Sequence, residues 1–296
     1  MAHLAPRRIL IRGGYHGTHQ TIQLLQRLGG ASGAEVADLD APVRPGDLVW
    51  LETPRNPDVA LADIGAYVEA GRAAGGGVDV VVDGTFAPPP LQRPLLLGAT
   101  AVVHSTTKSM AGHSDANGGA VVVPCAAAAE ALRGDRAAVG AVPGALEAWL
   151  LVRSLKTLPL RAARQSASAA AVAAFLDEAA SASSGGDADH PLAGLVHGVH
   201  YPGIGPDAAL AARQMPGGAG GTLAVLLASE AAAQALPGAL ELFADATSLG
   251  GVDSKAEWRK QYDDQVDGRL VRLSIGLEEP EDLIADLTET VLRLGA

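Results

Sequence analysis

The sequence has little cysteine and little positive charge, and both shortages exclude classes of protein. Cys125 is the single cysteine among 296 residues, so the chain cannot form an internal disulfide framework. Its apolar setting favours a packing role for the thiol, and its isolation favours a reducing, cytoplasmic location. The N-terminal segment 1–14 has too short an apolar run for a signal peptide.

Basic residues are outnumbered by acidic ones, 22 against 33, which gives a net charge of −11. Without a basic cluster, a surface for nucleic acid or for an anionic membrane is not expected. No uninterrupted apolar run reaches the roughly 18 residues that a bilayer-spanning helix needs. With 48% hydrophobic residues, the chain can bury a sizeable core. We therefore expect a small-molecule enzyme.

Strand-like and helix-like segments alternate in the first half of the chain. This alternation predicts an α/β fold with a mostly parallel sheet flanked by helices. Runs such as "VVV" suit strands that are buried on both faces. The predicted strands are residues 7–11, 34–39, 47–52, 78–83, 99–104 and 119–124, and the predicted helices are residues 18–29 and 62–75.

The second half of the chain predicts a different organisation. Residues 143–180 have a helical pattern interrupted by Pro159, which indicates two connecting helices, and residues 181–191 have a linker-like composition. Strand patterns at 222–227 and 269–277 and a helical pattern at 281–295 follow. We predict a large domain at 1–142, connecting helices at 143–180 and a smaller α+β domain at 181–296.

Polar side chains follow four of the predicted parallel strands, where ligands bind in such sheets. They are Tyr15 in "GGYHGT", Glu52 and Asn56 in "ETPRNP", Asp83 in "DGTF", and Ser105, Thr107 and Lys108 in "HSTTK". Each has an ordinary alternative: an Asp at a strand end is more often a turn or a cap, a Tyr in a glycine-rich loop usually packs, and a lone Lys is usually solvated.

Together, however, these residues match the needs of one cofactor. A carboxylate at the end of an apolar strand, as at Asp83, needs a cationic partner. A lysine can form a Schiff base with an aldehyde. Pyridoxal phosphate requires such a lysine, an acid for its pyridinium nitrogen, a flat ring for stacking and donors for its phosphate. The sequence therefore predicts pyridoxal phosphate at this sheet edge.

Two other motifs are weaker. The "GGYHG" loop followed by Asp38 imitates a dinucleotide-binding turn, but its glycines have the spacing G-G-x-x-G instead of G-x-G-x-x-G. His104, His113 and Asp115 match no common zinc spacing, so we expect loop hydrogen bonding and no metal there.

Five ordered blocks of the sequence closely resemble the Cys/Met-metabolism family of pyridoxal-phosphate enzymes, from about residue 8 to the C-terminus. The family includes cystathionine γ-synthases, γ-lyases and β-lyases and methionine γ-lyases, and it implies the type I fold of aminotransferases. The blocks are "LVWLETPRNP", the stretch from "VVVDGTF" to "DANGG", "RSLKTLPLRAARQ", "ATSLGGVDS" and "GRLVRLSIGLEEPEDLIADL".

The resemblance implies a role for each matching residue. Lys108 would bind the cofactor as a Schiff base and move protons on the substrate carbons, and Tyr15 would stack on the ring and assist proton transfer. Asp83 would pair with the pyridine nitrogen, Asn56 would approach the phenolic oxygen, and Ser105 and Thr107 would approach the phosphate. Arg272 in "VRLSIG" would bind the substrate α-carboxylate with help from Ser248.

The reaction is less sharply implied. The loop after Tyr15 lacks the cysteine that methionine γ-lyases usually carry. Asp253 in "SLGGVDS" stands where γ-type enzymes have an acid for the distal amino group of cystathionine. We expect γ-elimination or γ-replacement on L-cystathionine or an O-acylhomoserine in a homodimer or homotetramer; a β-lyase and a catalytically impaired homologue stay open.

The impaired alternative has its own motivation. Family members carry an N-terminal portion with further phosphate-binding and subunit-contacting residues, and the sequence shows no counterpart to it. Ser109 replaces a usual aromatic residue and Arg55 a usual small one.

Overall fold

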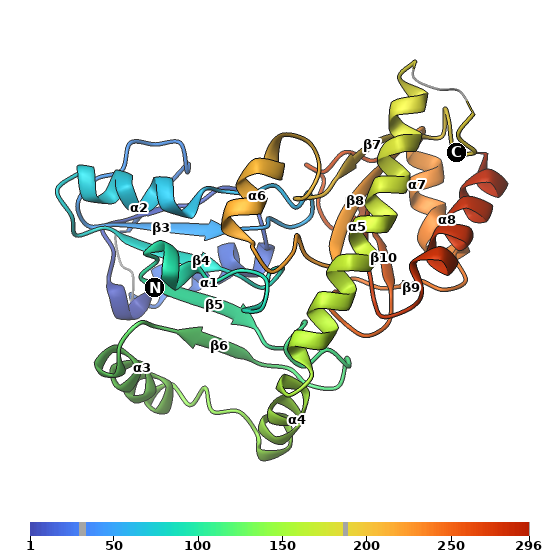
Figure 1. The fold of residues 1–296 in the computed structure, drawn as a ribbon. Helices are drawn as coiled ribbons and strands as arrows, with labels where there is room; N and C mark the ends of the chain where they lie inside the picture. The colour runs from blue at the N-terminus through green and yellow to red at the C-terminus, as the bar shows by residue number, and fades with distance from the viewer. Residues whose placement is uncertain (30–33, 186–188, 296) are drawn as a thin grey trace.

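The N-terminal part of the chain forms a six-stranded sheet with the order β2-β1-β3-β4-β5-β6. The structure is a computed structural model that describes residues 1–29, 34–185 and 189–295 (Figure 1). The five strands from β2 to β5 run parallel, and β6 pairs antiparallel with β5, which confirms the mostly parallel α/β prediction. The strands are β1 (Arg8–Leu10), β2 (Glu35–Ala37), β3 (Asp47–Glu52), β4 (Asp79–Asp83), β5 (Ala101–Ser105) and β6 (Gly119–Val122).

Strand β3 shows why helices cover both faces of this sheet. Successive side chains of a strand point to opposite faces. Leu48 and Trp50 pack in one cluster with Ile22 of helix α1 (His16–Arg27). Val49 and Leu51 pack in a second cluster with helix α2 (Ile64–Ala73), whose first turn is capped by the Asp63 side chain. The apolar residues of β3 therefore pack in two cores, one on each face of the sheet. The polar residues at the strand ends lie at the edge of the sheet.

The C-terminal part forms a second, five-stranded sheet with the order β7-β8-β11-β10-β9. Its pairings are antiparallel except β9 with β10. Apolar residues of these strands pack in one core with α5 (Leu158–Ser183), α7 and α8. The strands are β7 (Val196–His200), β8 (Thr222–Leu227), β9 (Ala244–Asp245), β10 (Lys255–Trp258) and β11 (Leu270–Ser274), and the helices are α6 (Ala208–Gln214), α7 (Glu230–Ala239) and α8 (Pro280–Leu294).

The predicted helix pair is present as α4 (Ala145–Leu155) and α5 (Leu158–Ser183). Pro159 lies in the first turn of α5, where a missing N–H costs nothing. Of the predicted linker 181–191, the first residues continue α5, and 186–188 lie outside the described residues. The domain boundaries stay a prediction. The elements that were not predicted individually are α3 (Ala126–Ala138), α6, α7, β7, β9 and β10. The 3₁₀ helices are η1 (Ala2–Leu4), η2 (Pro94–Leu97), η3 (Gly205–Asp207) and η4 (Arg259–Gln261).

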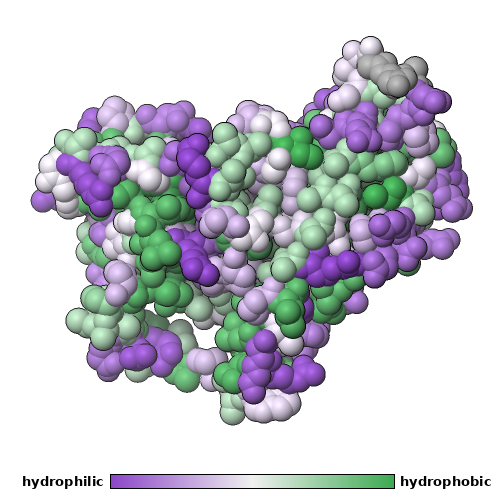
Figure 2. All heavy atoms as spheres, in the orientation of Figure 1, coloured by the Kyte–Doolittle hydropathy of each residue, from purple (hydrophilic) through white to green (hydrophobic). Residues whose placement is uncertain are grey.

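Helices α3 and α4 lie together at one side of the molecule, next to β6 (Figure 1). α3 has no buried residue. α4 exposes most of the surface of Leu146, Trp149 and Val152, and Figure 2 shows hydrophobic residues among charged ones in this region. The described residues therefore leave these three side chains of α4 uncovered, although Leu151 of the same helix packs against a core cluster. None of the helices that the structure describes is long and apolar enough to cross a membrane.

Candidate active site

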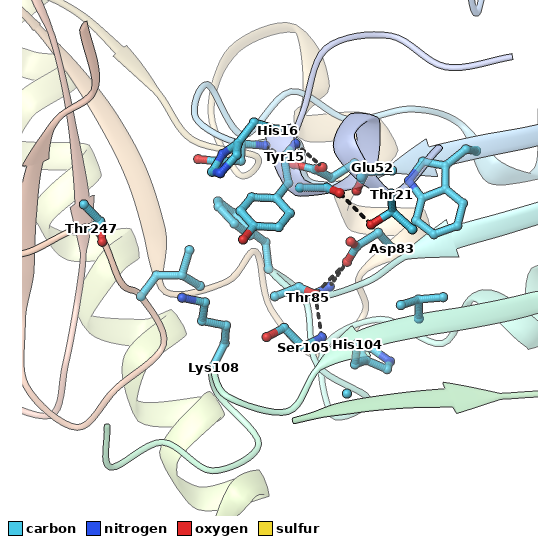
Figure 3. Close-up of a pocket in the computed structure, with 18 of the residues that line it drawn as sticks. Tyr15, His16, Thr21, Glu52, Asp83, Thr85, His104, Ser105, Lys108 and Thr247 are labelled. Atoms are coloured by element: carbon cyan, nitrogen blue, oxygen red, sulfur yellow. Dashed lines mark hydrogen bonds between the residues drawn. The ribbon is translucent and has the colours of Figure 1, made fainter. Parts of the chain in front are cut away.

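A cavity of about 740 Å³ lies between the N-terminal and the C-terminal parts of the chain. One wall is formed by loops at the carboxyl ends of β1, β3, β4 and β5, and the other by residues of the C-terminal part (Figure 3). Tyr15, Asn56, Asp83, Ser105 and Lys108 line the first wall. These five residues were grouped in the sequence because each follows a predicted parallel strand. In the structure they line one cavity.

Lys108 lies in the tight turn that follows β5 and extends across the cavity toward the C-terminal part (Figure 3). Its Nζ donates a hydrogen bond of 3.1 Å to Ser248 Oγ. Burial lowers the pKa of the Lys108 ammonium, and the Arg272 guanidinium adds to this effect. A lysine in this setting loses its proton more easily than an exposed one, as an amine that attacks an aldehyde must.

Asp83 ends β4 and points into the same space. Its Oδ1 accepts hydrogen bonds from the Thr85 hydroxyl at 2.6 Å and from the Thr85 N–H at 3.0 Å. Burial raises the pKa of the Asp83 carboxyl, and these two bonds oppose the rise. Within the described parts of the chain, no arginine or lysine forms an ion pair with Asp83. The carboxylate is thus suited to a cationic ligand.

Glu52, at the end of β3, fixes the loops on either side of it. Its carboxylate accepts hydrogen bonds of 2.7 Å from the backbone N–H of Tyr15 and from that of Asn56. Gly14 has a φ of +82°, and a Cβ atom there would stand 2.4 Å from Glu52 Oε2. Burial, reinforced by the Asp83 carboxylate, raises the pKa of Glu52 to about 7. Sequence reasoning noted this acid at the sheet edge but gave it no role.

Tyr15 is half exposed, and its ring contacts the His16 ring at a centroid distance of 4.7 Å. Ser105 is held through its backbone, because its N–H donates to Thr85 Oγ1 at 2.9 Å. Its hydroxyl faces the cavity (Figure 3). Both residues thus present a free group to a ligand: an aromatic face and a hydroxyl.

Arg272, on β11, is the main cation of the opposite wall and is 2% exposed. Its guanidinium donates to Asn56 Oδ1 at 2.7 Å and to the Thr247 carbonyl at 2.6 Å, and it pairs with Glu257. Burial lowers the pKa of Arg272 to about 10, and Glu257 opposes this shift. The arginine is therefore aligned before any carboxylate ligand arrives.

Three predicted residues do not line the cavity. Ser248 lies just behind it, bonded to Lys108. Thr107 has its Oγ1 turned to the loop 117–118, where it accepts a hydrogen bond from the Gly118 N–H at 3.0 Å. Asp253 is exposed and lies outside the cavity wall. The role expected for Asp253, contact with a distal amino group, is not one that its position supports.

Arg161 on α5 supports the lysine loop, a role that sequence reasoning missed. It donates to the backbone carbonyls of Ser109, Met110 and Ser154. One turn further along α5, Gln165 donates to the Gly251 carbonyl at 2.6 Å. Both residues lie within the block "RSLKTLPLRAARQ", which resembles the family. That resemblance marks the two positions, but it does not indicate which backbone carbonyls their side chains bind.

Comparisons with known proteins identify the family of this chain. A family model described as Cys/Met metabolism PLP-dependent enzyme matches residues 15–291. The chain belongs to this family. Similar chains include cystathionine gamma-synthase of Mycobacterium tuberculosis, 42% identical over 270 residues that cover 86% of this chain and 66% of that one. L-methionine gamma-lyase of Pseudomonas deceptionensis is 38% identical over 273 residues, covering 87% and 65%.

The fold agrees with this assignment. The crystal structure of cystathione gamma lyase from Micromonospora echinospora superimposes with a TM-score of 0.84 at 33% identity, over 98% of this chain and 79% of that one. The chain spans about two thirds of the length of the curated relatives it matches.

The family depends on pyridoxal phosphate (PLP), and the residues of the cavity fit that group. Lys108 offers an amine whose pKa is lowered, and Asp83 offers a buried carboxylate without a cationic partner among the described residues. The ring of Tyr15 and the hydroxyl of Ser105 border the same space.

Proposed function

We propose that the protein is a PLP-dependent transsulfuration enzyme that acts on L-cystathionine or an O-acylhomoserine by γ-elimination or γ-replacement. The observation that carries the proposal is the position of Lys108 between Asp83 on one wall and Arg272 on the other, in a single cavity. Relatives with synthase and with lyase names support both reaction types.

In this proposal each wall has a distinct task. Lys108 binds the cofactor aldehyde and takes or returns protons at the substrate carbons, which its lowered pKa favours. Asp83 would hold the protonated ring nitrogen and Ser105 would hold the phosphate, whereas the Thr107 hydroxyl is bonded to the loop 117–118. PLP, when bound, supplies the electron sink for the carbanions that elimination and replacement need.

Substrate orientation comes from the opposite wall. Arg272 would bind the α-carboxylate as a guanidinium fork, with Ser248 nearby. Asn56, which accepts a hydrogen bond from Arg272, ties this fork to the loop that follows β3.

Product identification tests the proposal. The purified protein with added PLP is incubated with L-cystathionine, or with cysteine and an O-acylhomoserine. Cysteine with 2-oxobutyrate indicates a γ-lyase, and a new thioether from the acylhomoserine indicates a γ-synthase. Homocysteine with pyruvate would instead identify a β-lyase. Absence of all these products, with PLP bound, would leave only a non-catalytic homologue.

We also propose that the chain forms homodimers or homotetramers in the cytoplasm. The exposed apolar residues of α4, among them Leu146, Trp149 and Val152, support self-association, because such patches usually mark an interface. Light scattering after gel filtration gives the mass. The variant Trp149→Glu is expected to shift it toward the monomer, whereas Glu130→Ala on exposed α3 leaves it unchanged. A monomeric mass for the unaltered chain would refute this proposal.

A further inference from the structure

Arg259 is a second arginine of the cavity wall. It begins η4 directly after β10 and lines the cavity although only 6% of its surface is exposed. Its Nη1 pairs with Glu257 Oε1 at 3.1 Å. Its Nε is buried and has no hydrogen-bond partner among the described residues. The Tyr262 ring, which also lines the cavity, lies 5.9 Å from the guanidinium.

One carboxylate serves two arginines here. Glu257 is 1% exposed; its Oε1 pairs with Arg259, and its Oε2 pairs with Arg272 at 2.5 Å. This wall therefore holds more positive than negative charge, and Lys108 extends toward it from the other wall. Buried charges that are not fully compensated are costly, so an anionic ligand would be favoured on this wall.

Arg272 already has a task in the proposed function, because it binds the α-carboxylate of the amino acid. Arg259 shares Glu257 with Arg272, so the two guanidinium groups lie on the same patch of wall. A ligand whose two anionic groups are separated by a few carbon atoms could reach both. Asp253, the residue expected to meet the distal end of the substrate, is exposed and outside the cavity.

We propose that Arg259 is a specificity-determining residue that recognises a carboxylate at the distal end of the substrate. It would favour substrates with an anionic side-chain terminus over those with a neutral one. This inference rests on the proposed function, since it takes Arg272 as the site of the α-carboxylate. The distal group of the substrate would then be recognised by a positive residue, Arg259. The sequence had suggested a negative residue, Asp253, for this task.

Equilibrium binding tests the inference without requiring turnover. Two amino acids of similar size, L-2-aminoadipate with a distal carboxylate and L-norleucine with a distal methyl group, are titrated into the PLP-loaded full chain by calorimetry. The unaltered protein should bind aminoadipate more tightly. Arg259→Met should weaken aminoadipate binding by about 10- to 100-fold, the range of a lost charge-assisted hydrogen bond. Norleucine binding should change less than about twofold, because a distal methyl group makes no hydrogen bond to lose.

Two further variants complete the test. Arg259→Lys keeps the charge and should retain most of the preference. Arg269→Met removes a partly exposed arginine that pairs with Asp267 and does not line the cavity, and it should change neither affinity. Equal affinity of the unaltered protein for both ligands overturns the inference even if Arg259→Met fails to fold. So does an equal loss for both ligands in Arg259→Met.

Kinetics separate this inference from the proposed function. The kcat/KM ratio for O-succinyl-L-homoserine over O-acetyl-L-homoserine should fall about 10-fold or more in Arg259→Met. Turnover of both esters with an unchanged ratio would refute the role of Arg259 and leave the proposed function intact. Tighter binding of aminoadipate that depends on Arg259, with no turnover of either ester or of L-cystathionine, would refute the proposed function alone.

Discussion

The two walls of the cavity differ in charge and in origin. The wall built on the parallel sheet carries Glu52 and Asp83, two acids whose pKa values are raised by burial. The wall of the C-terminal part carries Arg259 and Arg272, which share the single carboxylate of Glu257. An acidic wall suits a cationic ring, and a basic wall suits carboxylates. In the proposed function, this charge separation would place the cofactor on one side and the substrate on the other.

Removing the lysine between the walls should have the largest effect. Lys108→Ala should lower kcat/KM by about 10³-fold or more, because it deletes both a covalent attachment and a proton carrier. Initial rates with saturating PLP measure the loss. The exposed Lys156→Ala serves as the matched control and should keep the unaltered rate. A Lys108→Ala protein within about tenfold of the unaltered rate would exclude a proton-transfer role.

Neutralising the acidic wall should come next. Asp83→Asn keeps an oxygen that can accept from Thr85, so the fold should persist. Turnover should fall by about 10²- to 10³-fold, as when a preorganised charge in an active site is removed. Circular dichroism checks the fold, and Asp264→Asn at the exposed surface is the control. A nearly normal rate would mean that Asp83 does not face the ring nitrogen.

Weakening the basic wall should affect binding more than chemistry. Arg272→Lys keeps one positive charge but loses the fork that reaches Asn56 and the Thr247 carbonyl. KM for the amino acid should rise about 10- to 100-fold, and kcat should fall less. Steady-state kinetics separate the two constants. If kcat fell while KM stayed constant, Arg272 would act on the reacting atoms instead of the carboxylate.

The acidic wall should also make stability depend on pH. In the folded protein the pKa of Glu52 is raised to about 7, against 4.5 as its ordinary value. The folded state therefore holds the proton more tightly, and the free energy of unfolding falls as pH rises through this window. The loss is at most about 3 kcal/mol and is nearly complete by about pH 8.

Urea unfolding at pH 5 and pH 8 measures this dependence. Glu52→Gln should be less stable overall, because the NH₂ group of glutamine cannot accept a hydrogen bond from the N–H of Tyr15 or Asn56. The free energy of unfolding of this variant should nevertheless depend much less on pH. Asp83, whose pKa is also raised by burial, would account for the dependence that remains. An unchanged slope in Glu52→Gln would assign the dependence to other groups.

The smallest effect is expected at Asp253. Because it is exposed and outside the cavity, Asp253→Asn should change kcat/KM for L-cystathionine by less than about twofold, as surface substitutions usually do. A loss of tenfold or more would restore the role that the sequence suggested for this residue.

The acidic wall could be predicted from the sequence because a general rule applies to it. The strand β3 appears in the sequence as "DLVWLE" with the same bounds as in the structure, and the ends of parallel strands meet at one edge. Residues that follow such strands, such as Asp83 and Lys108, can be grouped without coordinates. The role of Glu52 as a hydrogen-bond acceptor that holds two loops was missed. Its partners are backbone N–H groups, and a pattern of side chains in the sequence does not reveal these.

The basic wall could not be predicted in the same way. Arg272 was found through a resemblance, and Arg259 was not found at all. Its place depends on the antiparallel pairing of β10 with β11, which sets Glu257 opposite Arg272. That register is a long-range contact without a local sequence signal. Arg161 was missed for the same reason, since its partners lie in the loop after Lys108.

The central claim, that Lys108 receives PLP between the two walls, is tested most directly by trapping. The full chain is incubated with PLP, reduced with borohydride and digested, and the peptides are mapped by mass spectrometry. The account predicts a stable pyridoxyl adduct on Lys108. An adduct on Lys156, Lys255 or Lys260 in place of Lys108, or no adduct at all, would contradict it.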